Sequence, residues 1–457
     1  MANKKTRPIK ADDLYKINVV SDLRISPSGK FVLFTKQHVD PETEEKYSNL
    51  WIIPTKGGKP ERFTKGDHKD NQARWSPDGK EIAFLSNRGD HDRKAQIFVK
   101  PLGGGKARQV TKVNGQISWV SWSPDGKQLL CRIRLLDEDE VERQEDELAK
   151  KLGVVSRHYQ RVFFKLDAEG YMPKDRWHIY RVEVKTGKVQ QLTDHEIFDD
   201  LDPTWSPDGN NIAYMSNHSN DPDFDRDAVD LFVMPASGGT PVKIDTAYGE
   251  KKLPSYSPDG SMIAYLGTEG KKQWYKNQGL WIVPSNGSGK SINLTEKYDV
   301  HVDPTTINDV GTPELMPPTW SKDGTTLFFP IMKNGRSMLC SIGMDGNNLE
   351  TLAGEQGVVG SFSFDKKHNR LAYLMGKIND PGQIYIKKTS SRKYNQLSNF
   401  NRKLFKNIDL GEIEEVWIKG PDDNDLQGWI LKPPGFDPQK KYPSILEIHG
   451  GPLTQYG

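Results

Sequence analysis

The chain has 457 residues, with 64 Lys and Arg against 62 Asp and Glu and a formal net charge of +2. This balance argues against a dedicated nucleic-acid-binding protein, which would carry a basic excess. A hydrophobic content of 35%, a mean hydropathy of −0.72, 41 Gly and 29 Pro are typical of an all-β protein with many short strands and polar turns.

The N-terminal segment, residues 1–21, is expected to be helical or extended. Its sequence "MANKKTRPIKADDLYKI" lacks the apolar core of a secretory signal peptide. Because the chain has no apolar run of about 18 residues, we expect no membrane span and a soluble, cytoplasmic protein. Cys131 and Cys340 lie in apolar runs and are too few for a disulfide framework, so we expect two buried small hydrophobic residues.

A short turn motif then recurs along the chain. In its full form it reads Trp-Ser-Pro-Asp-Gly, where Pro sets φ for a type I turn, Asp can accept from its own backbone and Gly takes a left-handed conformation. Its copies begin at Ile25, Trp75, Trp122, Trp205, Tyr256 and Trp320, with a degenerate copy at Phe362.

A second element, such as "LWIIPTKGGKPERFT", recurs in step with the first and reads as strand, turn and strand. One copy of each element makes four antiparallel strands, which must stack on neighbouring copies to bury both faces. We therefore predict an all-β, seven-bladed β-propeller over residues 22–400. The predicted blades lie near 22–64, 72–111, 118–193, 201–246, 252–296, 316–353 and 361–398.

The third blade carries a predicted insertion over residues 135–170. Within it, residues 137–153 place acidic residues first and lysines last, which suits the dipole of a short helix. A solvated insertion is one interpretation. The other is that the acidic stretch 137–147 forms a lip that captures a cationic group, such as a peptide amino terminus.

Beyond residue 398 the repeats stop. The stretches 414–420 and 426–435 alternate like a hairpin around "PDDND", and the apolar run 444–448 reads as a strand buried on both faces. His-Gly-Gly-Pro follows at 449–452. Glycines let backbone N–H groups approach a ligand oxygen closely, and such a turn after a strand serves the oxyanion hole of α/β-hydrolases.

Taken in order, the SPDG turns, the "GWILKPP" strand and "PSILEIHGGP" resemble the prolyl oligopeptidase family of serine peptidases, and most of all its acylaminoacyl peptidase and dipeptidyl aminopeptidase-like branch. The resemblance implies a substrate-gating propeller and an α/β-hydrolase domain, of which residues 411–457 would be the first part. It implies cleavage of short peptides or N-acyl peptides by a Ser-Asp-His triad. It assigns the oxyanion hole to Gly450 and Gly451, with His449 positioning the turn.

The sequence departs from that family in one respect. No Gly-x-Ser-x-Gly string occurs in residues 1–457, so we expect a chain truncated before the catalytic Ser, without catalytic residues of its own and inactive alone. No His/Cys group has zinc spacing and no nucleotide motif is present, so no metal or cofactor is expected. The alternative is a stand-alone Tol-type propeller that binds a protein or peptide partner.

Overall fold

The computed structural model describes residues 6–89, 94–154, 156–167, 169–307, 314–451 and 454–457. The chain is predominantly β, as the composition and the repeats indicated, and the few helices in the described part are short. Among the described residues, no helix is both long and apolar enough to cross a membrane.

Most strands of the described residues form seven successive sets of four, which we call sets 1 to 7, and each set is antiparallel within itself. Sets 1 and 2 comprise β2 (Val19–Ile25), β3 (Phe31–Val39), β4 (Lys46–Pro54) and β5 (Glu61–Arg62), then β6 (Asn71–Trp75), β7 (Glu81–Ser86), β8 (Gln96–Pro101) and β9 (Arg108–Gln109). Set 3 comprises β10 (Gly115–Trp122), β11 (Gln128–Leu135), β14 (His178–Glu183) and β15 (Val189–Gln191).

Sets 4 and 5 continue the pattern with β16 (Asp200–Trp205), β17 (Asn211–Ser216), β18 (Asp230–Pro235), β19 (Val242–Ile244), β20 (Lys251–Tyr256), β21 (Met262–Gly267), β22 (Gly279–Pro284) and β23 (Ile292–Asn293). Set 6 holds β25 (Thr319–Trp320), β26 (Thr326–Lys333), β27 (Arg336–Gly343) and β28 (Glu350–Ala353). Set 7 holds β29 (Val358–Phe364), β30 (Arg370–Lys377), β31 (Asp380–Lys388) and β32 (Tyr394–Gln396). Sets 6 and 7 are joined into one sheet by a parallel pairing of Ser337 with Val358.

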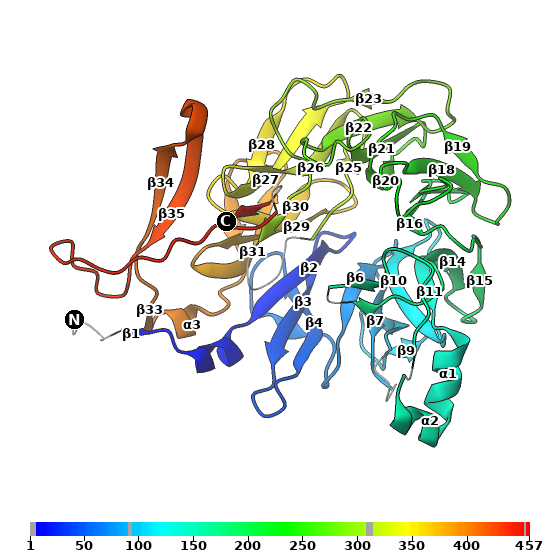
Figure 1. Cartoon of the computed structure of the whole chain (residues 1–457), viewed down its shortest axis with the longest axis horizontal. Coiled ribbons are helices and arrows are strands. Elements are labelled where there is room, and N and C mark those ends of the chain that lie inside the picture. The colour runs from blue at the N-terminus through cyan, green and yellow to red at the C-terminus, as the bar shows by residue number, and fades with distance from the viewer. Residues whose placement is uncertain (1–5, 90–93, 155, 168, 308–313, 452–453) are drawn as a thin grey trace.

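The sets follow one another around a common centre, with their first strands innermost (Figure 1). From set 1 to set 6 the first strand of each set contacts that of the next, and β2 contacts β29, so set 1 lies against set 7. The core sits between the sets, because each of the seven apolar clusters in the described residues draws its members from two neighbouring sets. The ring is therefore closed by side-chain packing, for example of Leu23 and Phe34 on Ala372 and Ile384.

The recurrent turn motif connects the first two strands of its set. In set 2, Ser76 Oγ donates to Asp78 Oδ1 at 2.7 Å and accepts from the N–H of Glu81 at 3.0 Å. Gly79 has a φ of +72°, the left-handed conformation in which glycine is not strained. The indole N–H of the motif donates to the first strand of the preceding set: Trp75 to Arg24 O at 3.1 Å, Trp122 to Arg74 O at 2.9 Å and Trp320 to Ser255 O at 3.1 Å.

A β-bulge interrupts the first strand of most sets, three residues before the motif's aromatic position. The residue there has a positive φ, as in Asp22, Gln72, Trp119, Asp202 and Leu253. Its side chain reaches the next set: Asp22 accepts from Ala73 N–H at 3.1 Å, Gln72 from Trp119 N–H at 2.8 Å and Asp202 from Leu253 N–H at 3.0 Å. These bonds join the inner strands of sets 1 and 2, of sets 2 and 3, and of sets 4 and 5.

The two cysteines are buried and unpaired, as expected, and burial raises the pKa of Cys131 to about 12. The connection between β11 and β14 holds α1 (Glu138–Glu145), α2 (Glu147–Leu152), β12 (Lys165–Leu166) and β13 (Gly170–Tyr171). The single helix predicted over 137–153 is thus two helices, which meet at Asp146, whose carboxylate caps the N-terminus of α2 by accepting from Ala149 N–H at 2.8 Å.

The segments outside the sets pair with one another. Residues 6–17 hold β1 (Arg7–Pro8) and the 3-10 helix η1 (Ala11–Lys16). After set 7 come α3 (Arg402–Phe405) and β33 (Ile408–Asp409), which pairs in parallel with β1. The predicted hairpin is present as β34 (Ile413–Lys419) and β35 (Asp425–Leu431), with the 3-10 helix η2 (Pro421–Asp423) at its tip. The chain ends with β36 (Gln455–Tyr456), which pairs in parallel with β24 (Thr306–Ile307).

Candidate functional site at the C-terminal turn

The His-Gly-Gly turn is exposed in the structure. Gly450 has open space around its Cα, and Gly451 has a φ of +147°, in the region that favours glycine. Thr454 Oγ1 donates to the carbonyl of Gly450 at 2.6 Å, and the ring of His449 lies edge-on to Tyr456 with centroids 5.4 Å apart. The N–H groups of both glycines make no hydrogen bond to a described residue, so they are free to donate to an external oxygen. Pro452 lies outside the described residues.

The run before this turn differs from its prediction. Residues 444–448 form no strand, and the side chains of Ile445, Leu446 and Ile448 are 96%, 85% and 81% exposed. A central parallel strand needs a hydrogen-bonded neighbour on each edge and packing on both faces. The described residues supply neither here, so the predicted buried strand is corrected to an extended, unpaired segment.

The C-terminal segment is nevertheless anchored to set 6. Gln455 Nε2 donates to Arg336 O at 2.9 Å, and Gln455 Oε1 accepts from Gly335 N–H at 2.9 Å. The hairpin contacts the same turn, because Arg336 forms an ion pair with Glu415 at 2.9 Å and the indole of Trp429 lies against the Cα of Gly335. One turn of set 6 therefore holds both the hairpin and the chain end.

This anchoring identifies which end of the strand sets faces the turn. In an antiparallel set, the first and third connections emerge at one end and the second connection at the other. The turn motifs form the first connections, so they lie at the end that carries the first and third connections. The β26–β27 turn and the β24 segment, which hold the C-terminal residues, lie at the opposite end. The insertion of set 3, being a second connection, also emerges at the end that faces His-Gly-Gly.

Several acidic side chains of that insertion already make contacts within the insertion itself. Asp137 accepts from Lys174 N–H at 2.8 Å, and Asp139 lies 3.6 Å from Lys174 Nζ. Asp146 caps a helix, as described above. Glu138 and Glu140 begin α1 at its N-terminus, where carboxylates interact favourably with the helix dipole.

The inner strands carry a charged cluster that sequence reasoning missed. Arg24 contacts Glu314 at 2.5 Å and Asp22 at 3.1 Å, and Arg74 contacts Asp22 at 2.7 Å. Burial opposes ionisation of Asp22, but Arg74 and Arg24 outweigh it and lower the pKa of this carboxyl. The position of Asp22 could have indicated it, because Asp22 stands three residues before Ile25, as Gln72 does before Trp75.

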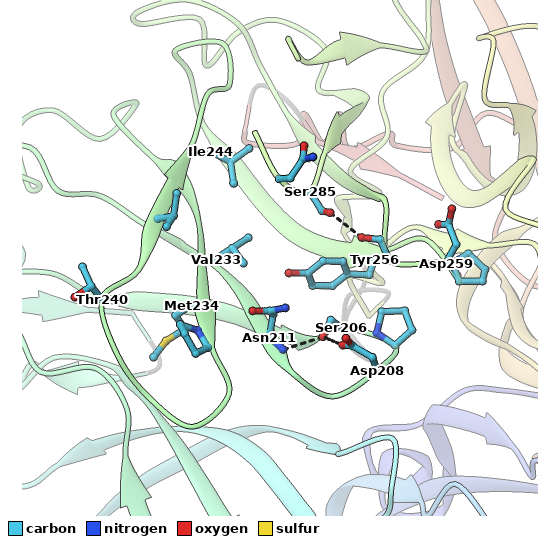
Figure 2. A pocket seen from close by; sticks show the side chains of 16 residues that line it. Ser206, Asp208, Asn211, Val233, Met234, Thr240, Ile244, Tyr256, Asp259 and Ser285 are labelled. Carbon is cyan, nitrogen blue, oxygen red and sulfur yellow. Dashed lines mark hydrogen bonds between the residues drawn. The ribbon is translucent and has the colours of Figure 1, made fainter. Parts of the chain in front are cut away.

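A cavity of about 740 Å³ lies between sets 4 and 5 at the end that carries the turn motifs (Figure 2). Ser206 in its wall donates to Asp208 at 2.5 Å, and Ser285 donates to the carbonyl of Gly260 at 2.7 Å. These hydroxyls serve the turns themselves, and the lining residues include no histidine or lysine that could activate a nucleophile. The cavity also lies at the end opposite to His-Gly-Gly, so we do not assign it to the same site.

The chain is similar to known peptidases, and part of it matches a propeller family. The family model described as the TolB beta propeller domain matches residues 18–153. Over 455 residues the chain is 30% identical to the uncharacterized peptidase YuxL of Bacillus subtilis, covering 98% of this chain and 67% of YuxL. It is 24% identical to dipeptidyl-peptidase 5 of Porphyromonas gingivalis, covering 95% of this chain and 62% of that protein.

Among solved structures, the acylaminoacyl peptidase of Pyrococcus horikoshii has the same overall fold. Its TM-score is 0.74 at 20% identity, over 97% of this chain and 62% of that structure. The chain thus spans about two thirds of the length of YuxL and somewhat less of the other two proteins.

Proposed function

We propose that this chain, which belongs to the peptidase family that includes YuxL of Bacillus subtilis, provides the substrate-gating part of a serine peptidase that cleaves short peptides or N-acyl peptides. In this proposal residues 22–400 are a seven-bladed propeller. Residues 411–457 are the first elements of an α/β-hydrolase domain, and residues 1–21 precede both.

One observation carries the proposal: the β34–β35 hairpin and the Gln455–Tyr456 strand are held together on the β26–β27 turn. This contact supports a position for the glycine-rich turn at one end of the ring of strand sets. A propeller can select substrates for a catalytic centre only if that centre lies at one of its ends. The names of the relatives, a dipeptidyl-peptidase and an acylaminoacyl peptidase, support peptides and N-acyl peptides as the substrate class.

The chemistry assigned to this chain is limited to one step. In acyl transfer by a serine nucleophile, the carbonyl oxygen of the substrate becomes an oxyanion that backbone N–H groups stabilise. Gly451 would supply one such N–H, and Gly450, without a side chain, would let the oxygen approach. The acidic stretch 137–147, which emerges at the same end, would attract the amino terminus of a peptide.

The 457 residues contain no Gly-x-Ser-x-Gly string, so we expect them to bind peptides without hydrolysing them. The test is an assay of purified 1–457 with dipeptidyl and N-acyl-aminoacyl p-nitroanilides and with a fluorophosphonate probe. The proposal predicts neither turnover nor labelling. Turnover that a serine-directed inhibitor abolishes would contradict it.

A further inference from the structure

A group of metal-binding side chains lies where set 3 passes into set 4. His195 belongs to the connection between the two sets, Asp200 is the first residue of β16, and His218 follows the end of β17. One potential ligand atom from each residue lies within 4.8 Å of the other two. The residues are 5 and 18 positions apart, a spacing typical of no zinc motif, which is why the sequence did not indicate them.

Asp200 is the decisive residue of this group. It is fully buried, and neither of its carboxylate oxygens accepts a hydrogen bond from a described residue. Its nearest cationic neighbour is His178, whose Nδ1 lies 3.5 Å from Oδ2. Burying a carboxylate without hydrogen bonds costs several kcal/mol, so this arrangement calls for a compensating charge.

His218 is the second unpartnered group. Its Nε2 is buried and makes no hydrogen bond to the described residues. The ring lies between Phe198 and Phe232, with centroids 4.3 Å and 4.4 Å away, and His195 meets it edge-on at 5.1 Å. The aromatic contacts fix the orientation of the His218 ring and keep water from its nitrogen.

We propose that His195, Asp200 and His218 bind a divalent transition-metal ion of the zinc class. Two imidazoles and one carboxylate are a donor set that zinc prefers, and the ion's charge would neutralise Asp200. Ligand atoms around four-coordinate zinc lie about 3.3 Å apart at bond lengths of about 2.0–2.1 Å, so the distances between the ligand atoms must shorten by up to about 1.5 Å. His178 would hydrogen-bond the second oxygen of Asp200 and orient it, as partners of metal ligands commonly do.

The competing arrangement is an ion pair between protonated His178 and Asp200. That pair would engage one oxygen of Asp200 and would leave His218 Nε2 buried without a partner. A metal ion that takes His218 Nε2 and an oxygen of Asp200 as ligands would satisfy both groups. It would also tie the connection that holds His195 to the one that holds His218, which is a structural role independent of peptide cleavage.

The test is stoichiometric zinc binding by the metal-free 1–457 chain, measured by competition with a chromophoric chelator and by metal analysis after dialysis. We expect one zinc per chain and an increase in melting temperature on addition of zinc. We expect Asp200→Asn and His218→Ala to weaken binding by more than about tenfold, and His195→Ala, which alters a half-buried residue and leaves the core intact, to do the same.

His158→Ala, in the exposed part of the insertion, is the matched control and should bind zinc as the wild type does. Circular dichroism spectra of the variants, compared with that of the wild type, serve as the test that each variant is folded. Absence of stoichiometric zinc in the wild type would overturn the proposal and favour the ion pair. Equal affinity in wild type and folded His195→Ala would overturn it as well.

Discussion

Asn401 and Asn18 are joined by three hydrogen bonds, although 383 residues separate them in the sequence. Asn401 Oδ1 accepts from Asn18 N–H at 2.7 Å, and Asn401 Nδ2 donates to Asn18 O at 2.8 Å. Asn401 has a φ of +64°, which Asn tolerates better than most residues. The pair fastens the segment before set 1 to the segment after set 7, next to the packing that closes the ring.

Removing this link should destabilise the whole ring. We expect Asn401→Ala to lower the free energy of unfolding by about 1–3 kcal/mol, because a buried amide pair is lost and Ala is strained at positive φ. Urea unfolding followed by tryptophan fluorescence measures the change. Asn407→Ala, which removes a local bond to Lys403 O, should have a smaller effect. Equal unfolding midpoints for the wild type and Asn401→Ala would contradict this interpretation.

The indole N–H groups of the turn motifs offer a matched comparison. Trp122 Nε1 donates to Arg74 O in the neighbouring set, whereas the buried Nε1 of Trp205 makes no hydrogen bond to the described residues. Both substitutions replace an indole by the smaller phenyl side chain, but only Trp122→Phe breaks a hydrogen bond between sets. We expect Trp122→Phe to destabilise by about 1–3 kcal/mol more than Trp205→Phe in thermal and urea unfolding. The reverse order would contradict a role for the indoles in joining sets.

The turn carboxylates should make stability depend on pH in the acid range. Hydrogen bonds from Ser257 and then Ser261 hold the pKa of Asp259 at about 2, below its usual value of 3.8. A folded-state pKa below the unfolded one stabilises the fold above the unfolded value, and the benefit is lost as pH falls through the folded value.

We therefore expect the destabilisation caused by Asp259→Asn to be largest at neutral pH and to shrink as pH falls from about 4 to about 2. Urea unfolding of the wild type and the variant across this range measures it. Asp67→Asn, at an exposed turn residue outside the motifs, serves as the control. A penalty for Asp259→Asn that stays constant down to pH 2 would contradict the assigned hydrogen bonds.

The attachment of the C-terminal segment depends on Gly335. Its φ is +65°, and a Cβ there would collide with the indole of Trp429. We expect Gly335→Ala to release the β34–β35 hairpin, so that limited proteolysis cleaves residues 406–457 faster while the strand sets stay folded. Gly89 has a similar φ of +76° but open space around it, so Gly89→Ala imposes the backbone strain without the collision. Equal proteolysis of the two variants would show that the collision does not matter.

Local chemistry made the turns predictable, since the Ser76 hydroxyl, the Asp78 carboxylate and the Gly79 backbone act within a few residues of each other. The paired turn elements likewise indicated a mainly β chain with a hairpin after residue 410. The Asn18–Asn401 link was not predictable, because it depends on the ring being closed. The residues at the β-bulges share a position but not a side-chain type, so no motif revealed them.

At the candidate site, too, local features were predictable from the sequence and long-range contacts were not. Glycines at 450 and 451 indicated a turn from their lack of side chains, and in the structure Gly450 lies at a bend and Gly451 has a positive φ. The run 444–448 has the composition of a buried strand, but a strand forms only where neighbours supply hydrogen bonds. The His195, Asp200 and His218 group comes from three segments that approach one another only after sets 3 and 4 have packed.

The most direct test of the central claim joins residues 1–457 to the part of YuxL that follows the aligned region. The proposal predicts that this chimera hydrolyses dipeptidyl or N-acyl-aminoacyl p-nitroanilides, whereas 1–457 alone does not. It also predicts that Gly451→Pro, which removes the oxyanion N–H, lowers the kcat of the chimera by about 100-fold or more. A folded, monodisperse chimera without peptidase activity, or one whose activity is unchanged by Gly451→Pro, would contradict the account.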